Sequence, residues 1–318
     1  MEVKPDLVIR TEFEDVTKSN TLMRLSKAFY AKDLPWKLVS RALLKEDGKK
    51  ELRLTLFCNA VSESPGWSCD ASIDTVLINA DPEKNRVEKL DHKFHHDGVG
   101  RVSNQIIDCE GWTEPEKGFL KGDRCIIETR IFVKKTTNVR KLNLVDYTKP
   151  ADNQKNAILV VEGKRLYVSW DLLAVNSPLF AARLGRCAEM GKKEMVLKDM
   201  DYDEFVDVLN AIYPTMIEIN FSTVKHILMH AFHYKLEYAL YRAELYLIKT
   251  TKIAVLEKLV LADTYRLPVL TAHCLGHYTD MDSLTALKPT NEYDGFSNVT
   301  KAAICDRIMD LCTTKSQQ

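Results

Sequence analysis

Three histidines, His226, His230 and His233, have the spacing best suited to chemistry in this sequence. Steps of four and three residues place the three imidazoles on one face of a helix, where they could hold a metal ion. The other face is apolar and would point to the core, through Val224, Ile227, Leu228 and Ala231. No carboxylate or cysteine lies nearby in sequence. We therefore predict a solvent-facing polar stripe without a metal, and keep a metal-dependent enzyme as the alternative.

The other polar clusters have simpler structural explanations. His92, His95 and His96 fall in a predicted loop, and His273 and His277 fall on a predicted helix surface. An acidic cluster precedes a predicted helix, whose N-terminus favours negative charge: Asp199, Asp201, Asp203 and Glu204. We expect no metal or cofactor at any of these positions.

Motifs of common enzymes are missing from the sequence. It contains no Gly-x-Ser-x-Gly hydrolase motif, no phosphate-binding Gly-x-x-x-x-Gly-Lys-Ser/Thr loop and no Cys-x-x-Cys pair for zinc. Nothing in the local sequence marks one of the eight cysteines as a nucleophile. We therefore expect a protein that is not an enzyme.

Composition and charge limit the classes of partner. The chain has 318 residues, which favours two domains, and 45 basic residues balance 45 acidic ones. This balance argues against nucleic-acid binding. No apolar stretch approaches the ~20 residues of a membrane span, and the charged start lacks the apolar core of a secretory signal. With its scattered cysteines, the chain is expected in the cytoplasm or nucleus, without nucleic-acid or membrane partners.

The two halves of the chain differ in their periodicity. In the first half, Leu52, Leu54 and Leu56 alternate with polar residues, and two further stretches repeat this pattern, as in an antiparallel sandwich. Residues 136–152 are polar, contain Pro150 and are predicted to be a linker, or alternatively an extra edge strand within 139–147. After the linker the chain is rich in helical patterns, such as 201–212, where Asp201 and Glu204 have the spacing of a capping box.

The stretch 158–180 changes its period halfway along. Residues 158–168 predict a hairpin around Glu162-Gly163-Lys164, and the following residues predict a helix that ends near Ser177-Pro178. This unit resembles the start of a BTB (POZ) domain, where a hairpin leads to Leu-Ala-x-x-Ser-x-x-Phe, here residues 173–180. Downstream, "MVLKDMDYDEFVDVLNAIYP" is similar to the next strand, helix and Ile-Tyr turn of that family.

The first half resembles a MATH domain, the sandwich related to TRAF proteins. The similarity rests on "LPWKLVSRA", "LRLTLFCN", "WSCDASIDTVLIN", "DHKF" and "GFLKGDRCIIETRIFV". The resemblance implies an all-β antiparallel TRAF-like sandwich, followed by an α+β BTB domain with a helical C-terminal tail. The expected bounds are 4–135 for MATH, 136–152 for the linker, 153–265 for BTB and 266–318 for the C-terminal helical extension.

The order MATH then BTB is similar to the MATH-BTB proteins expanded in nematodes. The resemblance implies a substrate adaptor of a cullin-3 ubiquitin ligase, with the MATH domain binding target proteins and the BTB domain forming a homodimer and binding cullin-3. Such an adaptor needs no catalytic residue. A scaffold that oligomerises through its BTB domain without a cullin is the alternative.

The same resemblance implies candidate site residues. For the cullin contact, which often uses hydrophobic-x-Glu, the candidates are Leu184, Cys187, Glu189 and Tyr213. For the dimer interface they are Leu172, Leu173, Leu179 and Phe180. For the target groove they are Thr55, Thr75 (or its neighbour Ile73), His92, Val99 and Arg101.

Two departures from the family pattern narrow these expectations. Asn156-Ala157 replaces a common Asp, and Ser169-Trp170 replaces a His and a basic residue, which argues against a borrowed repressor-peptide pocket. The groove positions lack the family's aromatic residues, so known target preferences do not carry over.

Overall fold

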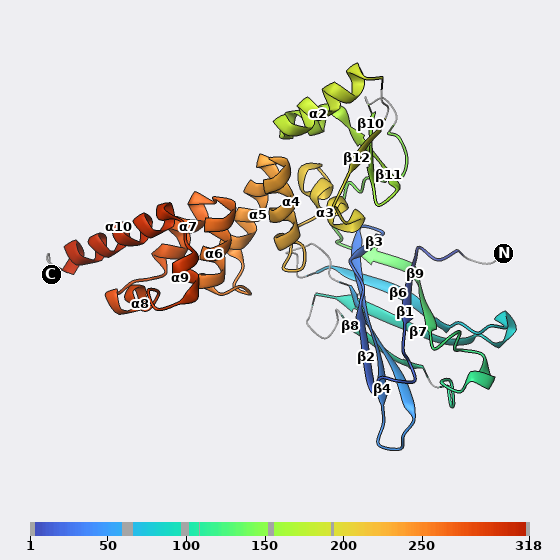
Figure 1. The fold of residues 1–318 in the computed structure, drawn as a ribbon. Coiled ribbons are helices and arrows are strands. Elements are labelled where there is room, and N and C mark those ends of the chain that lie inside the picture. Colours follow the sequence, from blue (N-terminus) through green and yellow to red (C-terminus); the bar gives the residue numbers. More distant parts are fainter. Residues whose placement is uncertain are drawn as a thin grey trace. The chain divides into compact units, whose positions relative to one another are not determined.

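The computed structural model describes residues 4–58, 66–96, 102–107, 109–151, 156–191 and 194–315. The chain divides into two compact units, 1–142 and 143–318. The first is a β-sandwich, and the second joins a small sheet to a series of helices (Figure 1). Within the described residues, no helix has the length and apolar character needed to cross a membrane.

The first unit consists of two antiparallel sheets. One has the order β1 (Leu7–Phe13), β9 (Cys125–Thr137), β6 (Ser68–Leu77) and β7 (Arg86–His95). The other has the order β2 (Thr21–Leu25), β4 (Leu34–Leu44), β5 (Lys50–Cys58) and β8 (Val102–Ile107), and β3 (Phe29–Ala31) pairs with β4. Two short 3₁₀ helices, η1 (Pro82–Lys84) and η2 (Pro115–Lys117), lie in the connections.

The core of the sandwich follows the alternation seen in the sequence. Leu52, Leu54 and Leu56 of β5 are all buried, as the period-two pattern predicts. Trp36 of β4 and Phe94 of β7 meet edge to face, with ring centroids 5.2 Å apart. Large aromatic side chains therefore join the two sheets at the centre of this unit.

The segment predicted as a linker is packed more closely than its polar composition indicates. Residues 138–151 form neither a helix nor a strand, so the alternative of an extra edge strand is wrong. Leu142 is buried in the first unit, and Tyr147 is buried in the second. The Tyr147 carbonyl also accepts a hydrogen bond from the Tyr167 amide (2.8 Å).

The second unit begins with the predicted hairpin. β10 (Asn156–Val161) and β11 (Lys164–Ser169) are antiparallel, and β12 (Glu194–Leu197) pairs with β10 in parallel. Glu162 and Gly163 form the two-residue turn with φ of 48° and 75°. Positive φ at both positions matches the right-handed twist of the strands, which is why glycine suits this turn.

Ten helices follow or flank this small sheet in the described residues. α1 and α2 lie between β11 and β12, and α3 to α10 come after β12. Their bounds are α1 (Trp170–Asn176), α2 (Pro178–Glu189), α3 (Tyr202–Ile212), α4 (Val224–Tyr234), α5 (Glu237–Lys249), α6 (Val255–Tyr265), α7 (Pro268–Gly276), α8 (Met281–Thr285), α9 (Asn291–Gly295) and α10 (Asn298–Lys315).

Ser177 and Pro178 separate α1 from α2, as the sequence predicts. The buried Ser177 hydroxyl accepts a hydrogen bond from the Phe180 amide (3.0 Å), which caps α2, and donates one to the Tyr234 carbonyl (2.5 Å). Pro178 stands at the first turn, where its missing N–H costs nothing. Phe180 then stacks on Tyr234, with centroids 5.0 Å apart. One short stretch therefore fixes both the helix start and its packing against α4.

Phe180→Ala should destabilise the second unit by about 3–5 kcal/mol, because it removes a fully buried ring and leaves a cavity. The matched control is Phe221→Ala, because Phe221 is 50% exposed. This substitution should change the free energy of unfolding by no more than about 0.5 kcal/mol. Urea unfolding followed by circular dichroism at the helical band reports this unit. Equal losses in the two variants would contradict the assigned core position.

Candidate protein-interaction surfaces

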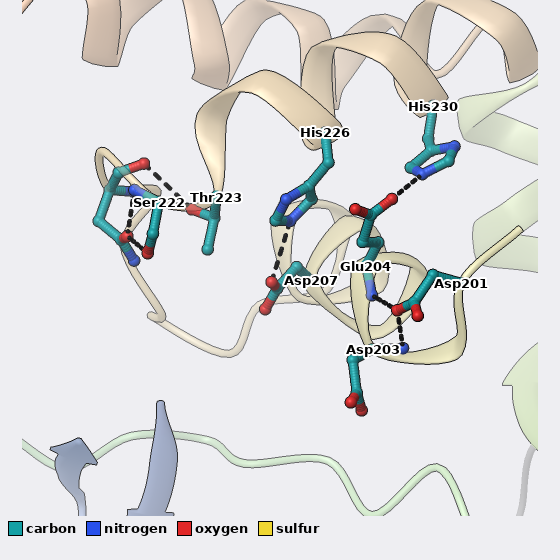
Figure 2. Close-up of polar contacts among 9 residues, drawn as sticks. Asp201, Asp203, Glu204, Asp207, Ser222, Thr223, His226 and His230 are labelled. Atoms are coloured by element: carbon teal, nitrogen blue, oxygen red, sulfur yellow. Dashed lines mark hydrogen bonds and ion pairs between the residues drawn. The ribbon is translucent and has the colours of Figure 1, made fainter. Parts of the chain in front are cut away.

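The face of α4 that carries the histidines packs against α3. His226 Nε2 lies 3.0 Å from Asp207 Oδ2, and His230 Nε2 lies 2.7 Å from Glu204 Oε2 (Figure 2). His230 is only 5% exposed, and of the three histidines only His233 faces solvent. The prediction of a solvent-facing stripe is therefore wrong for His226 and His230. The helix pairing supplies the carboxylates that the local sequence lacks.

This arrangement is a pair of contacts between helices. Each of the two imidazoles lies against its own carboxylate, and the pairs are one helical turn apart. Across the described residues, no group of three or more His, Cys, Asp or Glu side chains could hold a metal ion. The geometry thus gives His226 and His230 a role in packing.

Asp201 caps α3, as its place in the sequence predicts. Its carboxylate accepts hydrogen bonds from the Asp203 amide (2.8 Å) and the Glu204 amide (2.9 Å). In the expected capping box the Glu204 side chain would bind back to residue 201. It binds His230 instead, so only half of the box forms (Figure 2).

A second histidine pair lies at the C-terminal end of α7, where His277 directly follows the helix. His273 Nε2 is 3.3 Å from His277 Nε2, and the rings meet edge to face. Partial burial lowers the pKa of His273, and the neighbouring His277 lowers it further. His277 is exposed, in keeping with the predicted helix surface.

Only part of the candidate cullin surface is accessible. Glu189 is exposed at the end of α2 and Cys187 is half-buried, but Leu184 is buried in the core of its own chain. Tyr213 is also buried, and its hydroxyl accepts a hydrogen bond from the Ser169 amide (2.6 Å). Burial raises the pKa of Tyr213. Leu184 and Tyr213 therefore support the fold here, and Cys187 and Glu189 remain as a predicted contact.

The candidate dimer residues divide in the same way. Leu173 and Phe180 are fully buried and have no surface for a second copy, because both fill the core beneath α1 and α2. Leu172 and Leu179 are half-buried and keep some surface. Val175 lies between them and is 85% exposed. We missed it in the sequence, although it stands three residues after Leu172 on the same predicted helix.

The candidate target groove lies in the sandwich and is only partly accessible. Thr55 and His92 are half-buried, while Val99 and Arg101 fall outside the described residues. Thr75 is fully buried, and its hydroxyl bonds to the Gln105 side chain across the two sheets. Its place in a groove is therefore wrong, because the side chain points into the core. The neighbouring Ile73 is fully buried as well.

The sandwich also carries a charged depression of about 750 Å³ that we did not predict. Its charges are mostly paired: Lys89 with Asp74 (3.4 Å) and Lys134 with Asp91 (2.8 Å). The lining residues come from the outer face of one sheet and the chain start: Lys4, Asp6, Ser72, Asp74, Lys89, Leu90, Asp91, Phe132, Val133 and Lys134. Because charges of both signs are paired there, the depression does not favour a partner of either net charge.

Comparison with protein families identifies both units. A MATH domain model matches residues 13–133, and a BTB/POZ domain model matches residues 149–251. The chain contains a MATH domain followed by a BTB domain. The expected fold class and the resemblance stated from the sequence are thereby confirmed. Both kinds of domain are typically non-catalytic. MATH domains support substrate binding, and BTB domains support oligomerisation and protein–protein interaction.

Relatives named for the same two domains match most of this chain. BTB and MATH domain-containing protein 36 of Caenorhabditis elegans is 29% identical over 267 residues, covering 82% of this chain and 83% of the relative. BTB and MATH domain-containing protein 38 of the same organism is 26% identical over 303 residues, covering 92% and 76%. A solved BTB domain of zebrafish PATZ1 matches 30% of this chain and 75% of that chain, at 16% identity and a TM-score of 0.26.

His230→Ala should destabilise the BTB domain by about 1–3 kcal/mol, because it removes a buried ring and its hydrogen bond to Glu204. His233→Ala on the same helix should change stability by no more than about 0.5 kcal/mol, since His233 is exposed. Chemical denaturation measures both. If His233→Ala lowers the free energy of unfolding as much as His230→Ala does, the packing role of His230 is wrong.

Proposed function

We propose that this chain recruits target proteins to a cullin-3 ubiquitin ligase. The proposal is carried by the presence of a MATH domain and a BTB domain in one chain, in that order. In this role the MATH domain binds a target peptide, and the BTB domain forms a homodimer and contacts cullin-3. The relatives named for the same two domains, which share most of the chain, support this assignment.

The physical contribution of such an adaptor is proximity. Holding a target beside the ubiquitin-loaded enzyme turns a bimolecular encounter into a local one. A dimer presents two MATH domains, so weak peptide contacts gain avidity through a high effective concentration. Neither effect needs a catalytic residue. The proposed place of action is the cytoplasm or the nucleus, which suits eight free cysteines, and no nucleic-acid or membrane partner is proposed.

The proposed cullin contact lies at the C-terminal end of α2. Glu189 is exposed there, and the half-buried Cys187 two residues earlier supplies the apolar neighbour. Together they follow the hydrophobic-x-Glu pattern, although a cysteine offers less apolar area than a larger side chain. The carboxylate would pair with a basic or hydrogen-bonding group on the cullin, which contributes mainly to specificity.

Glu189→Lys should weaken cullin-3 binding about 10-fold or more, because it reverses the charge at the proposed contact. Glu292→Lys on α9 is the control, because Glu292 is also exposed. The affinity of this variant for cullin-3 should match that of the wild type. Biolayer interferometry with purified cullin-3 N-terminal domain measures both. Unchanged binding by Glu189→Lys would reject this contact, and a wild type that does not bind would reject the adaptor role.

The proposed dimer face is the exposed side of the α1–α2 junction. Leu172, Val175 and Leu179 lie close together along the chain there, and Val175 exposes most of a branched apolar side chain. An isologous contact through this patch would bury these residues against their copies. Leu173 and Phe180 would act indirectly, by fixing the two helices from within the core.

Val175→Asp together with Leu179→Asp should convert the dimer to a monomer, because the change places charges in an apolar contact. Val299→Asp on α10 is the matched control, since Val299 is 80% exposed and its variant should stay dimeric. Light scattering at micromolar concentration gives the mass. A wild type that is already monomeric contradicts the dimer, and dissociation by Val299→Asp alone would move the interface to α10.

A scaffold that oligomerises without a cullin is the second candidate. The burial of Leu184 favours it, because the proposed cullin contact then has one apolar residue fewer. In that case depletion of the protein would change the assembly of its complexes and leave target half-lives unchanged. Affinity purification with mass spectrometry distinguishes the two, since an adaptor co-purifies with cullin-3.

A further inference from the structure

Two buried cysteines face each other across the MATH sandwich. Cys58 ends β5 and lies opposite Trp36 of β4, while Cys69 of β6 lies opposite Phe94 of β7. Partners opposite each other on neighbouring strands point to the same side of their sheet. Since the Trp36 and Phe94 rings meet between the sheets, with centroids 5.2 Å apart, the two cysteines beside them also point into the gap. Both are 0% exposed.

The Cys58 thiol interacts with the Cys69 thiol. Burial raises the pKa of the Cys58 thiol well above its usual value, and a hydrogen bond with the Cys69 thiol raises it further. The third buried cysteine of this domain, Cys125, has different surroundings. Burial raises the pKa of Cys125 to about 12, and its hydrogen bond is with the backbone of Phe13. Cys58 and Cys69 therefore differ from Cys125 in having a thiol as a neighbour.

We propose that Cys58 and Cys69 form an oxidisable pair that closes into a disulfide between the two sheets. β-Sandwiches accommodate such inter-sheet disulfides, as the immunoglobulin fold does. The ring would enclose the ten residues between the two cysteines, 59–68, and would stabilise the domain chiefly by restricting its unfolded chain. Burial of both thiols and the raised pKa of the Cys58 thiol slow the reaction at neutral pH, so the pair oxidises slowly even when the oxidant is in excess.

The reaction exchanges one disulfide for another. One thiol loses its proton, attacks glutathione disulfide and releases one glutathione as a thiol. The second thiolate then attacks the mixed disulfide, which forms the Cys58–Cys69 bond and releases the second glutathione. The protein loses two electrons and two protons, and the two glutathione molecules take them up.

The position of the pair connects it to the candidate groove. His92 packs its ring against Phe94, with centroids 4.5 Å apart, and Phe94 is the strand partner of Cys69. The disulfide would therefore fix the layer beneath one of the groove positions. The proposal itself depends on the packing of the two sheets and holds for any target that the MATH domain binds.

The full-length chain is incubated for a day with glutathione disulfide, alkylated and digested without reduction. Mass spectrometry should find a Cys58–Cys69 cross-linked peptide, reversed by dithiothreitol. The melting temperature of the MATH domain should rise by about 5 °C on oxidation, because the cross-link restricts the unfolded state. Cys125→Ala should keep both effects, and Cys58→Ala and Cys69→Ala should each lose both.

Three results would overturn the proposal. The two cysteines could stay free or carry glutathione separately, they could pair with other cysteines, or their cross-link could form only after unfolding in urea. Each would mean that the folded domain does not oxidise Cys58 and Cys69 as a pair. Mapping of the wild-type chain gives this answer even if an alanine variant fails to fold.

Discussion

The second unit depends on the junction at Ser177, where one hydroxyl serves two helices. It caps α2 at the Phe180 amide and donates to the last carbonyl of α4, at Tyr234. This fixes α2 against α4 and places Phe180 on the Tyr234 ring, with Phe205 of α3 completing the aromatic cluster. The hairpin and the helical series share one core, and this junction lies within it. A buried hydroxyl with both of its bonds satisfied can hold such a position at little cost.

Other polar side chains also bind backbone groups of neighbouring segments along the helical series. Arg242 of α5 donates to the carbonyls of Ala211 (2.9 Å) and Ile217 (2.8 Å), and so holds the chain after α3. Glu244, buried on the same helix, accepts from the Leu270 amide at the start of α7 (2.8 Å). One continuous group of buried residues runs from Tyr147 to Ile304. The BTB domain and the helices after it are therefore packed as one body.

Accessibility decides which of the candidate residues can act on a partner. A family motif reports both the residues that build the fold and those that meet other proteins, and it does not separate them. Leu173, Phe180 and Leu184 match the pattern because they fill the core. Val175 and Glu189 are exposed and can contact other molecules. The proposed interaction surface therefore consists of the residues that remain after the core is accounted for.

The sequence by itself determined the order of the two domains and most of the elements. Alternating Leu52, Leu54 and Leu56 encode a strand with one buried face, and the turn at Glu162-Gly163 encodes the hairpin, since both signals act over a few residues. Local sequence likewise placed Asp201 at the start of α3.

Only the tertiary structure decided what these elements meet. The spacing of His226 and His230 fits a solvated stripe and a helix contact equally well. The contact forms because α3, about 20 residues earlier in the chain, brings Asp207 and Glu204 to the two imidazoles. The alternation of β6 already places Thr75 on the buried face with Ile73, but only the packing of β8 supplies Gln105 as the partner of its hydroxyl. Cys58 and Cys69 are neighbours because the two sheets pack face to face. Such contacts are set by packing between distant segments, which no local period encodes.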